Sequence, residues 1–136
     1  MRAAQIPPST LGIDVLSGAG EEWITLSGEL DIATVPPLRE ALGLCLLAPS
    51  PRIVIDAAGL SFIAVIGVRL VAIAHKDALD RGGSLVVRGL TPAVRRVFEL
   101  CDGLVLPLHG LLDHHSALAP DRARPPQTTP TVVAAA

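Results

Sequence analysis

The side chains of this sequence that could do chemistry fall into a few small groups. The densest group is His109, Asp113, His114 and His115, whose imidazoles and carboxylate are of the kinds that bind metal ions. These residues form one local run near the end of the chain, and no second group of ligands stands elsewhere in the sequence. We interpret the run as a solvated chain end and predict no metal site.

Two carboxylates and three arginines form the other groups. Asp31 and Asp56 end predicted strands or follow them directly, where α/β proteins place binding residues. The pair has no third ligand, and residues of this type more often cap a helix or fix a loop. Arg88, Arg95 and Arg96 could bind an anion, but we interpret them as part of a solvated helix face.

The sequence motifs of common enzymes are missing. No glycine-rich phosphate loop follows a strand, no G-x-S-x-G turn is present, and no pair of histidines has zinc-binding spacing on a helix. We therefore predict that the protein is not an enzyme and uses no cofactor. A small-molecule pocket lined by Asp31, Asp56 and Arg88 would reverse that prediction.

Composition restricts the class of protein and its partners. The 136 residues fit one domain, and a formal net charge of -2 argues against a nucleic-acid partner. Half of the residues are hydrophobic but only 2% are aromatic, which favours an aliphatic core of the kind found in parallel sheets covered by helices. Cys45 and Cys101 lie far apart and match no metal-ligand spacing, so we expect two buried thiols.

Nothing in the sequence indicates a membrane partner. The N-terminal segment MRAAQIPPST has no apolar block of the signal-peptide type, and the apolar stretch over 57–68 is too short to cross a bilayer. We expect a cytoplasmic protein.

Hydrophobic spacing and turn residues predict a regular order of elements that must position these side chains. Strands that alternate with amphipathic helices imply parallel pairing through crossovers, and the opening hairpin is the antiparallel exception. The sequence therefore predicts an α/β fold with a mixed sheet over 10–112, a flexible segment over 1–9 and a disordered tail rich in Pro, Ala and Thr over 113–136. The expected elements are strands over 11–15 and 23–27, a helix after Thr34, a strand over 52–56, a helix from Gly67, a strand over 84–88, a helix from Pro92 and a weak strand over 104–106.

Several motifs over 24–106, taken together and in their order along the chain, resemble the STAS domain, and more narrowly the bacterial anti-sigma factor antagonists. The motifs are Gly28-Glu-Leu-Asp31, Leu38-Arg-Glu-Ala-Leu42, Ile53-Val-Ile-Asp56-Ala-Ala-Gly59-Leu-Ser-Phe62-Ile63, Gly67, Gly82-Gly-Ser-Leu85 and Leu90-Thr-Pro-Ala-Val-Arg-Arg-Val-Phe98. The resemblance implies a mixed, mostly parallel sheet that is flanked by helices and works by docking. Antagonists of this family bind an anti-sigma factor of the serine-kinase type and so release a sigma factor for transcription.

One motif of the family is altered. The family carries Asp-Ser-Ser-Gly or Asp-Ser-Thr-Gly at the start of the second helix, where the partner kinase phosphorylates a serine and switches docking off. The matching residues here are Ala64, Val65, Ile66 and Gly67. Ile66 holds the phosphoacceptor position and has no oxygen, so it cannot gain the charge of about -1.5 to -2 that a phosphate brings. Ser61 is a potential substitute, which we interpret as a turn or strand-end residue.

The resemblance predicts a partner-binding surface at this helix start and the adjoining loops. Its residues are Asp31, Phe62, Ile63, Ala64, Val65, Ile66, Gly67 and Arg69. The sequence leaves three destinations open for Val65 and Ile66: the domain's own core, a permanent contact with the partner, or a homodimer. The leading hypothesis is an antagonist-like regulatory module without the usual switch, and the alternative is a scaffold or oligomer subunit that assembles through the apolar loop 62–67.

Overall fold

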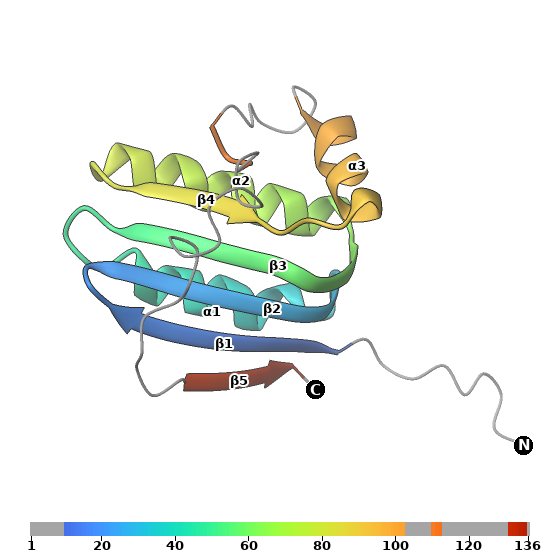
Figure 1. The fold of residues 1–136 in the computed structure, drawn as a ribbon, viewed down its shortest axis with the longest axis horizontal. Coiled ribbons are helices and arrows are strands. Elements are labelled where there is room, and N and C mark those ends of the chain that lie inside the picture. Colours follow the sequence, from blue (N-terminus) through green and yellow to red (C-terminus); the bar gives the residue numbers. More distant parts are fainter. Residues whose placement is uncertain (1–9, 103–109, 113–130, 136) are drawn as a thin grey trace, which may run out of the picture.

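The computed structural model describes residues 10–102, 110–112 and 131–135. A mixed sheet with strand order β4-β3-β2-β1-β5 forms the centre of the molecule (Figure 1). An antiparallel hairpin is followed by strands that pair in parallel, which confirms the predicted fold class. The strands are β1 (Leu11–Gly18), β2 (Glu21–Leu30), β3 (Arg52–Ile63), β4 (Ser84–Arg88) and β5 (Thr131–Ala135).

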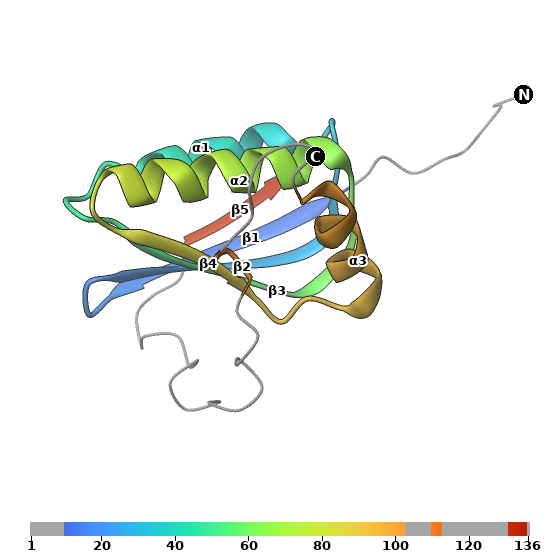
Figure 2. The ribbon, with the colours of Figure 1, turned by 90° about the horizontal axis from the view of Figure 1, so that it is seen from above.

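The helices α1 (Val35–Cys45) and α2 (Val65–Asp80) lie side by side on one face of the sheet (Figure 2). Each connects two parallel strands, so both helices start at the same end of the sheet and run in the same direction. The third helix, α3 (Pro92–Cys101), lies at the end where β3 leads into α2 (Figure 1). This end carries the candidate site.

The core lies between the sheet and the two helices. Alternate residues of the strands, such as Ile24, Leu26 and Ile55, face the helices and are buried. They meet the inner faces of α1 and α2, which bury residues at spacings of three and four, as a helix covering a sheet must. Phe98 is the only aromatic side chain among the largest fully buried ones of the described residues, which agrees with the aliphatic core predicted from composition.

Glycines end α2 where the sequence placed the stop. Gly82 has φ of +79°, and the amide of Gly83 donates to the carbonyl of Ala78 at 2.8 Å, which closes the helix C-terminus. A Cβ on Gly83 would lie 1.8 Å from the carbonyl oxygen of Pro51, so no other residue fits there without movement of the backbone. Beside this end, Nδ1 of the buried His75 lies 3.0 Å from the carbonyl of Leu85 and ties α2 to β4.

The boundary between β3 and α2 differs from the prediction. The strand continues to Ile63 instead of ending near Asp56, and α2 begins at Val65 instead of Gly67. Two shifts in register opposite β2 let β3 continue past its glycine, so that Phe62 pairs with Glu29 and Ile63 with Leu30. The predicted apolar loop is therefore the end of a strand and the first turn of a helix, with Ala64 between them.

The C-terminal residues differ from the prediction as well. Residues 131–135 form β5, which pairs antiparallel with β1, so disorder over the whole of 113–136 is wrong for this segment. The β-branched run Thr131-Val-Val133 suits an edge strand. The predicted weak strand over 104–106, the segment 1–9 and the run from His109 to His115 lie outside the described residues, except that 110–112 are seen and Leu112 bridges to Val87.

A candidate docking surface at the start of helix α2

The candidate site is built where β2 and β3 end side by side. The amide of Ala64 donates to the carbonyl of Leu30 at 2.9 Å, one step beyond the last paired residues of the two strands. This bond holds the turn from β2 to α1 against the start of α2. Residues 31–34 and 62–66, which are separated by a whole helix and strand in the sequence, therefore share one end of the sheet.

Helix α2 starts without a capping side chain. Its N-cap residue, Ala64, has the extended conformation of a capping residue, with φ of -91° and ψ of 164°, but no oxygen that could accept from the first turn. No acidic residue stands in that turn either. The backbone is thus arranged as for a capped helix, while the electrostatic partner of the helix dipole is missing.

Gly67 allows α2 to approach the sheet closely. A Cβ at this position would lie 2.8 Å from Cγ of Leu30 and 2.9 Å from Cγ1 of Ile63. Both neighbours are buried core residues, so neither can move aside easily. Gly67 and Ile63, which is only 3% exposed, lie in the interior and do not belong to the outer surface that the sequence predicted for them. They support the surface from beneath.

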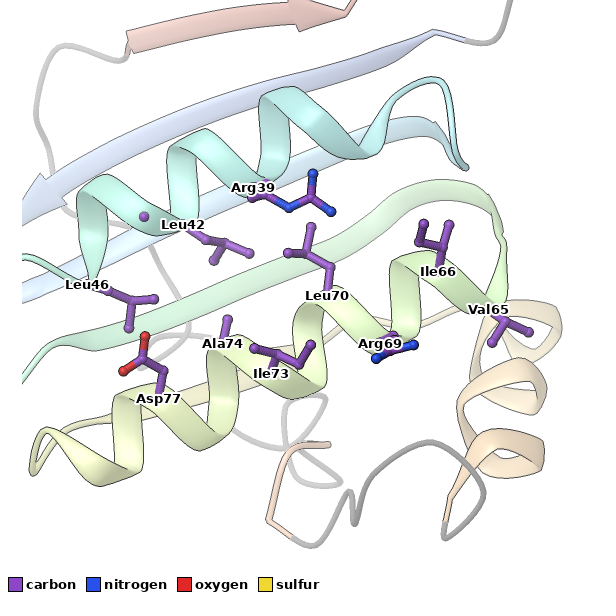
Figure 3. A pocket seen from close by; sticks show the side chains of 11 residues that line it. Arg39, Leu42, Leu46, Val65, Ile66, Arg69, Leu70, Ile73, Ala74 and Asp77 are labelled. Atoms are coloured by element: carbon purple, nitrogen blue, oxygen red, sulfur yellow. The ribbon is translucent and has the colours of Figure 1, made fainter.

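Val65 and Ile66 have different environments. Val65 is 55% exposed at the first helical position, whereas Ile66 is half-buried and packs against the core. Figure 3 shows Ile66 on the side of α2 that faces α1, and Val65 at the outer end of the helix. Ile66, which the resemblance aligns with a phosphoacceptor, is therefore partly withdrawn from solvent, whereas its neighbour Val65 exposes an apolar side chain.

Asp31 organises the neighbouring turn. Its Oδ1 accepts from the amides of Ala33 at 3.0 Å and Thr34 at 3.2 Å, and its own amide donates to Oγ1 of Thr34 at 2.9 Å. Oγ1 of the fully buried Thr34 donates in turn to the carbonyl of Glu29 at 2.7 Å. Asp31 thus fixes the loop, as the structural interpretation of the two carboxylates predicted. Asp56 acts in the same way, with Oδ1 accepting from the amide of Ala58 at 3.0 Å.

The structure adds one residue that the sequence interpretation missed. Ile32, held between Asp31 and Ala33, is 76% exposed, and Phe62 on the adjacent strand end is 48% exposed. The sequence could have indicated Ile32, because it is an isoleucine outside any predicted strand or helix and directly follows the motif that ends at Asp31. We call Asp31, Ile32, Phe62, Ala64 and Val65 the junction surface, because all five lie at the end of the sheet where β2 and β3 end. Its three large apolar side chains, Ile32, Phe62 and Val65, are exposed, as is typical of surfaces that contact another protein.

The described residues contain no group of three or more histidine, cysteine or acidic residues placed to hold a metal ion. Burial, with a smaller contribution from Glu22, raises the pKa of the Cys45 thiol to about 11, which is the opposite of an activated nucleophile. Within the same ranges, no helix is both long and apolar enough to span a membrane.

Comparison with known proteins decides the family. A family model described as "Mlab, STAS domain" matches residues 16–103, which include the end of β1, the whole of β2, the four elements from α1 to β4, and α3. The chain belongs to the STAS domain family. The matched range contains every residue of the junction surface.

Several solved structures share the fold of this chain. An anti-sigma factor antagonist from Mycobacterium paratuberculosis is 27% identical, with a TM-score of 0.63 over 82% of this chain and 94% of that one. The antagonist SpoIIAA in its unphosphorylated form is 22% identical, with a TM-score of 0.59 over 82% of this chain and 97% of that one. The murine anion transporter Slc26a9 is 14% identical, and the likeness covers 83% of this chain but 22% of the transporter, with a TM-score of 0.59.

Proposed function

We propose that this STAS domain is a non-catalytic regulatory module that docks on an anti-sigma factor of the serine-kinase type through the junction surface. By occupying that factor it frees a sigma factor for transcription, in the cytoplasm of a bacterial cell. Docking is not switched by phosphorylation at the start of α2. One observation carries the proposal: the junction surface is apolar and exposed, and Ile66, which has no side-chain oxygen, stands beside it where the family has its phosphorylated serine.

The choice of partner is supported by the antagonist from Mycobacterium paratuberculosis, which this chain matches over nearly its whole length. The likeness to SpoIIAA and Slc26a9 supports the fold alone. An antagonist needs no catalytic group, and the described residues offer an inert buried thiol and two carboxylates used in turns.

The physical basis of docking is burial of apolar area. Ile32, Phe62 and Val65 expose large parts of their side chains, and complete burial of one such side chain stabilises a contact by about 1.5 to 3 kcal/mol. A charge introduced into such a contact would be desolvated without a partner, which is costly. Contacts made by these side chains do not depend on a covalent signal.

The test is a pairwise binding measurement between this chain and each kinase-type anti-sigma factor encoded in the same genome, by calorimetry. Val65→Asp is the informative variant because Val65 is exposed, so the domain should fold normally. A substitution of the half-buried Ile66 could weaken binding by disturbing the fold, so its effect would be harder to interpret. We expect one such factor to bind the wild type and to bind Val65→Asp at least about tenfold more weakly. Leu100→Asp, at an exposed leucine of α3, is the matched control and should bind like the wild type.

A second function, as a scaffold or oligomer subunit, is favoured by the same exposed side chains, because Ile32, Phe62 and Val65 could equally be covered by another copy of the chain. Light scattering at micromolar concentration separates the two functions. A dimer that Val65→Asp converts to a monomer, together with no binding to any kinase-type factor, would replace the proposal. A monomeric wild type would exclude assembly through this surface at that concentration.

A further inference from the structure

A groove of about 600 Å³ runs between α1 and α2 on the outer face of the helical layer (Figure 3). Leu42, Leu46 and Ala74 are nearly buried and form its floor, while Ile73 and Val65 are about half exposed. The stretch of α2 from Val65 to Asp77 that lines it is about 18 Å long, at about 1.5 Å per residue. This volume falls within the range of about 300 to 1,000 Å³ typical of small-molecule sites.

The charges around the groove are concentrated at one end. Arg39 extends from α1 toward the end where both helices begin, and Arg69 lies on α2 one turn beyond Val65 (Figure 3). Neither arginine makes an ion pair with another described residue. Asp31 lies directly before α1 and offsets the positive end of that helix, whereas α2 has no acidic residue in its first turn, so the positive end of its dipole adds to the two guanidinium groups.

The opposite end carries little free charge. Asp77, the acidic residue among those lining the groove, is bound to Nε of Arg81 at 2.7 Å. Between the two ends the lining is aliphatic, apart from Gly43. The groove therefore offers a cationic end and a long apolar remainder, which is complementary to a molecule with one anionic head and one uncharged tail.

We infer that this groove binds a free long-chain fatty acid, with the carboxylate beside Arg39 and Arg69 and the acyl chain lying along Leu42, Leu46, Leu70 and Ala74. Burial of the methylene groups supplies the affinity, and the exposed arginines orient the chain. This binding goes beyond the proposed docking function and does not depend on it. The two sites share Val65, and Ile66 lines the groove beside it.

The test uses the purified full-length chain and palmitate below its micelle concentration, measured by calorimetry and by displacement of a fluorescent fatty acid. We expect saturable binding of one palmitate per chain, with chemical shift changes at groove amides. Hexadecyltrimethylammonium, which has the same tail and the opposite charge, should not compete. The double variant Arg39→Glu/Arg69→Glu should bind about tenfold more weakly or worse, and Arg52→Glu, at the far end of β3, should bind like the wild type.

The variant Gly43→Leu tests the groove without changing its charge. A Cβ at Gly43 meets nothing within 4 Å and the residue lies within α1, so a leucine should leave the fold intact while filling the groove. We expect it to abolish palmitate binding and to leave the affinity for the anti-sigma factor unchanged. The inference is overturned by absence of saturable binding, by equal binding of the cationic amphiphile, by normal binding in Gly43→Leu, or by binding only to anionic phospholipid vesicles. It is also overturned if light scattering shows a dimer that Gly43→Leu disrupts, because a second copy would then cover the groove.

Discussion

At the scale of single residues, the candidate site depends on a position where the packing leaves no room for a side chain. Gly67 is the clearest case, since two buried side chains stand within 3 Å of where its Cβ would be. A glycine inside a helix normally costs stability relative to alanine, so its presence here is explained by packing. The sequence predicted that Gly67 opens the second helix but gave no sign that it is buried, because closeness to Leu30 arises only when the two strands are paired.

Gly67→Ala and Gly43→Ala should therefore have opposite effects. Alanine at position 67 overpacks the core, which typically costs about 1 to 3 kcal/mol and exceeds the gain in helix propensity. Alanine at position 43 has free space and should stabilise the fold by up to about 1 kcal/mol. Urea denaturation of both variants measures the difference. If Gly67→Ala is as stable as Gly43→Ala, the close packing of α2 on Leu30 and Ile63 is wrong.

The raised pKa of Cys45 gives a prediction on pH. Because burial holds the pKa near 11 instead of 9.0, the thiolate fraction at pH 8 should be about a hundredfold lower than for an ordinary thiol. In a Cys101→Ala variant, alkylation of native Cys45 should be at least that much slower than alkylation in urea, and its rate should keep rising with pH up to about 11. A native rate at pH 8 equal to the rate in urea would contradict the burial of this thiol.

At the scale of elements, the sequence predicted the order of strands and helices because hydrophobic periodicity and the turn residues agree with one another. It ended β3 too early because Asp56 and Gly59 are residues typical of turns, and the register shifts that carry β3 past Gly59 depend on its pairing with β2. Asp31, Ala64 and Val65 were predicted for the surface, whereas Ile32 was missed because exposure of a loop residue is set by its neighbours in space.

The uncapped start of α2 gives a prediction at this scale. Ala64 already has the backbone conformation of a capping residue, so the carboxylate of Ala64→Asp should accept from a backbone amide of the first turn without rearrangement. We expect the free energy of unfolding to rise by about 1 kcal/mol. Ala64→Asn supplies the oxygen without the charge and should retain most of the gain at high salt. Unfolding free energies unchanged in both variants would show that the helix does not begin at Val65.

At the scale of the whole molecule, one sheet face carries two parallel helices whose shared start forms both the junction surface and the cationic end of the groove. The STAS family fixes this arrangement, and the departure of this chain lies in the residues placed on it. The family motif expected from the resemblance has an acid and hydroxyls at the positions where this chain has Ala64, Val65 and Ile66. Under the proposed function, the domain keeps the fold of a regulatory module but has no hydroxyl at Ile66 that could be phosphorylated.

The most direct test of this account is the affinity of the chain for the kinase-type anti-sigma factor proposed as its partner, measured before and after incubation with Mg²⁺ and ATP, with the intact mass recorded alongside. The account predicts one dissociation constant and an unchanged mass under both conditions. A mass increase of one phosphate within residues 10–112, accompanied by loss of binding, would contradict it.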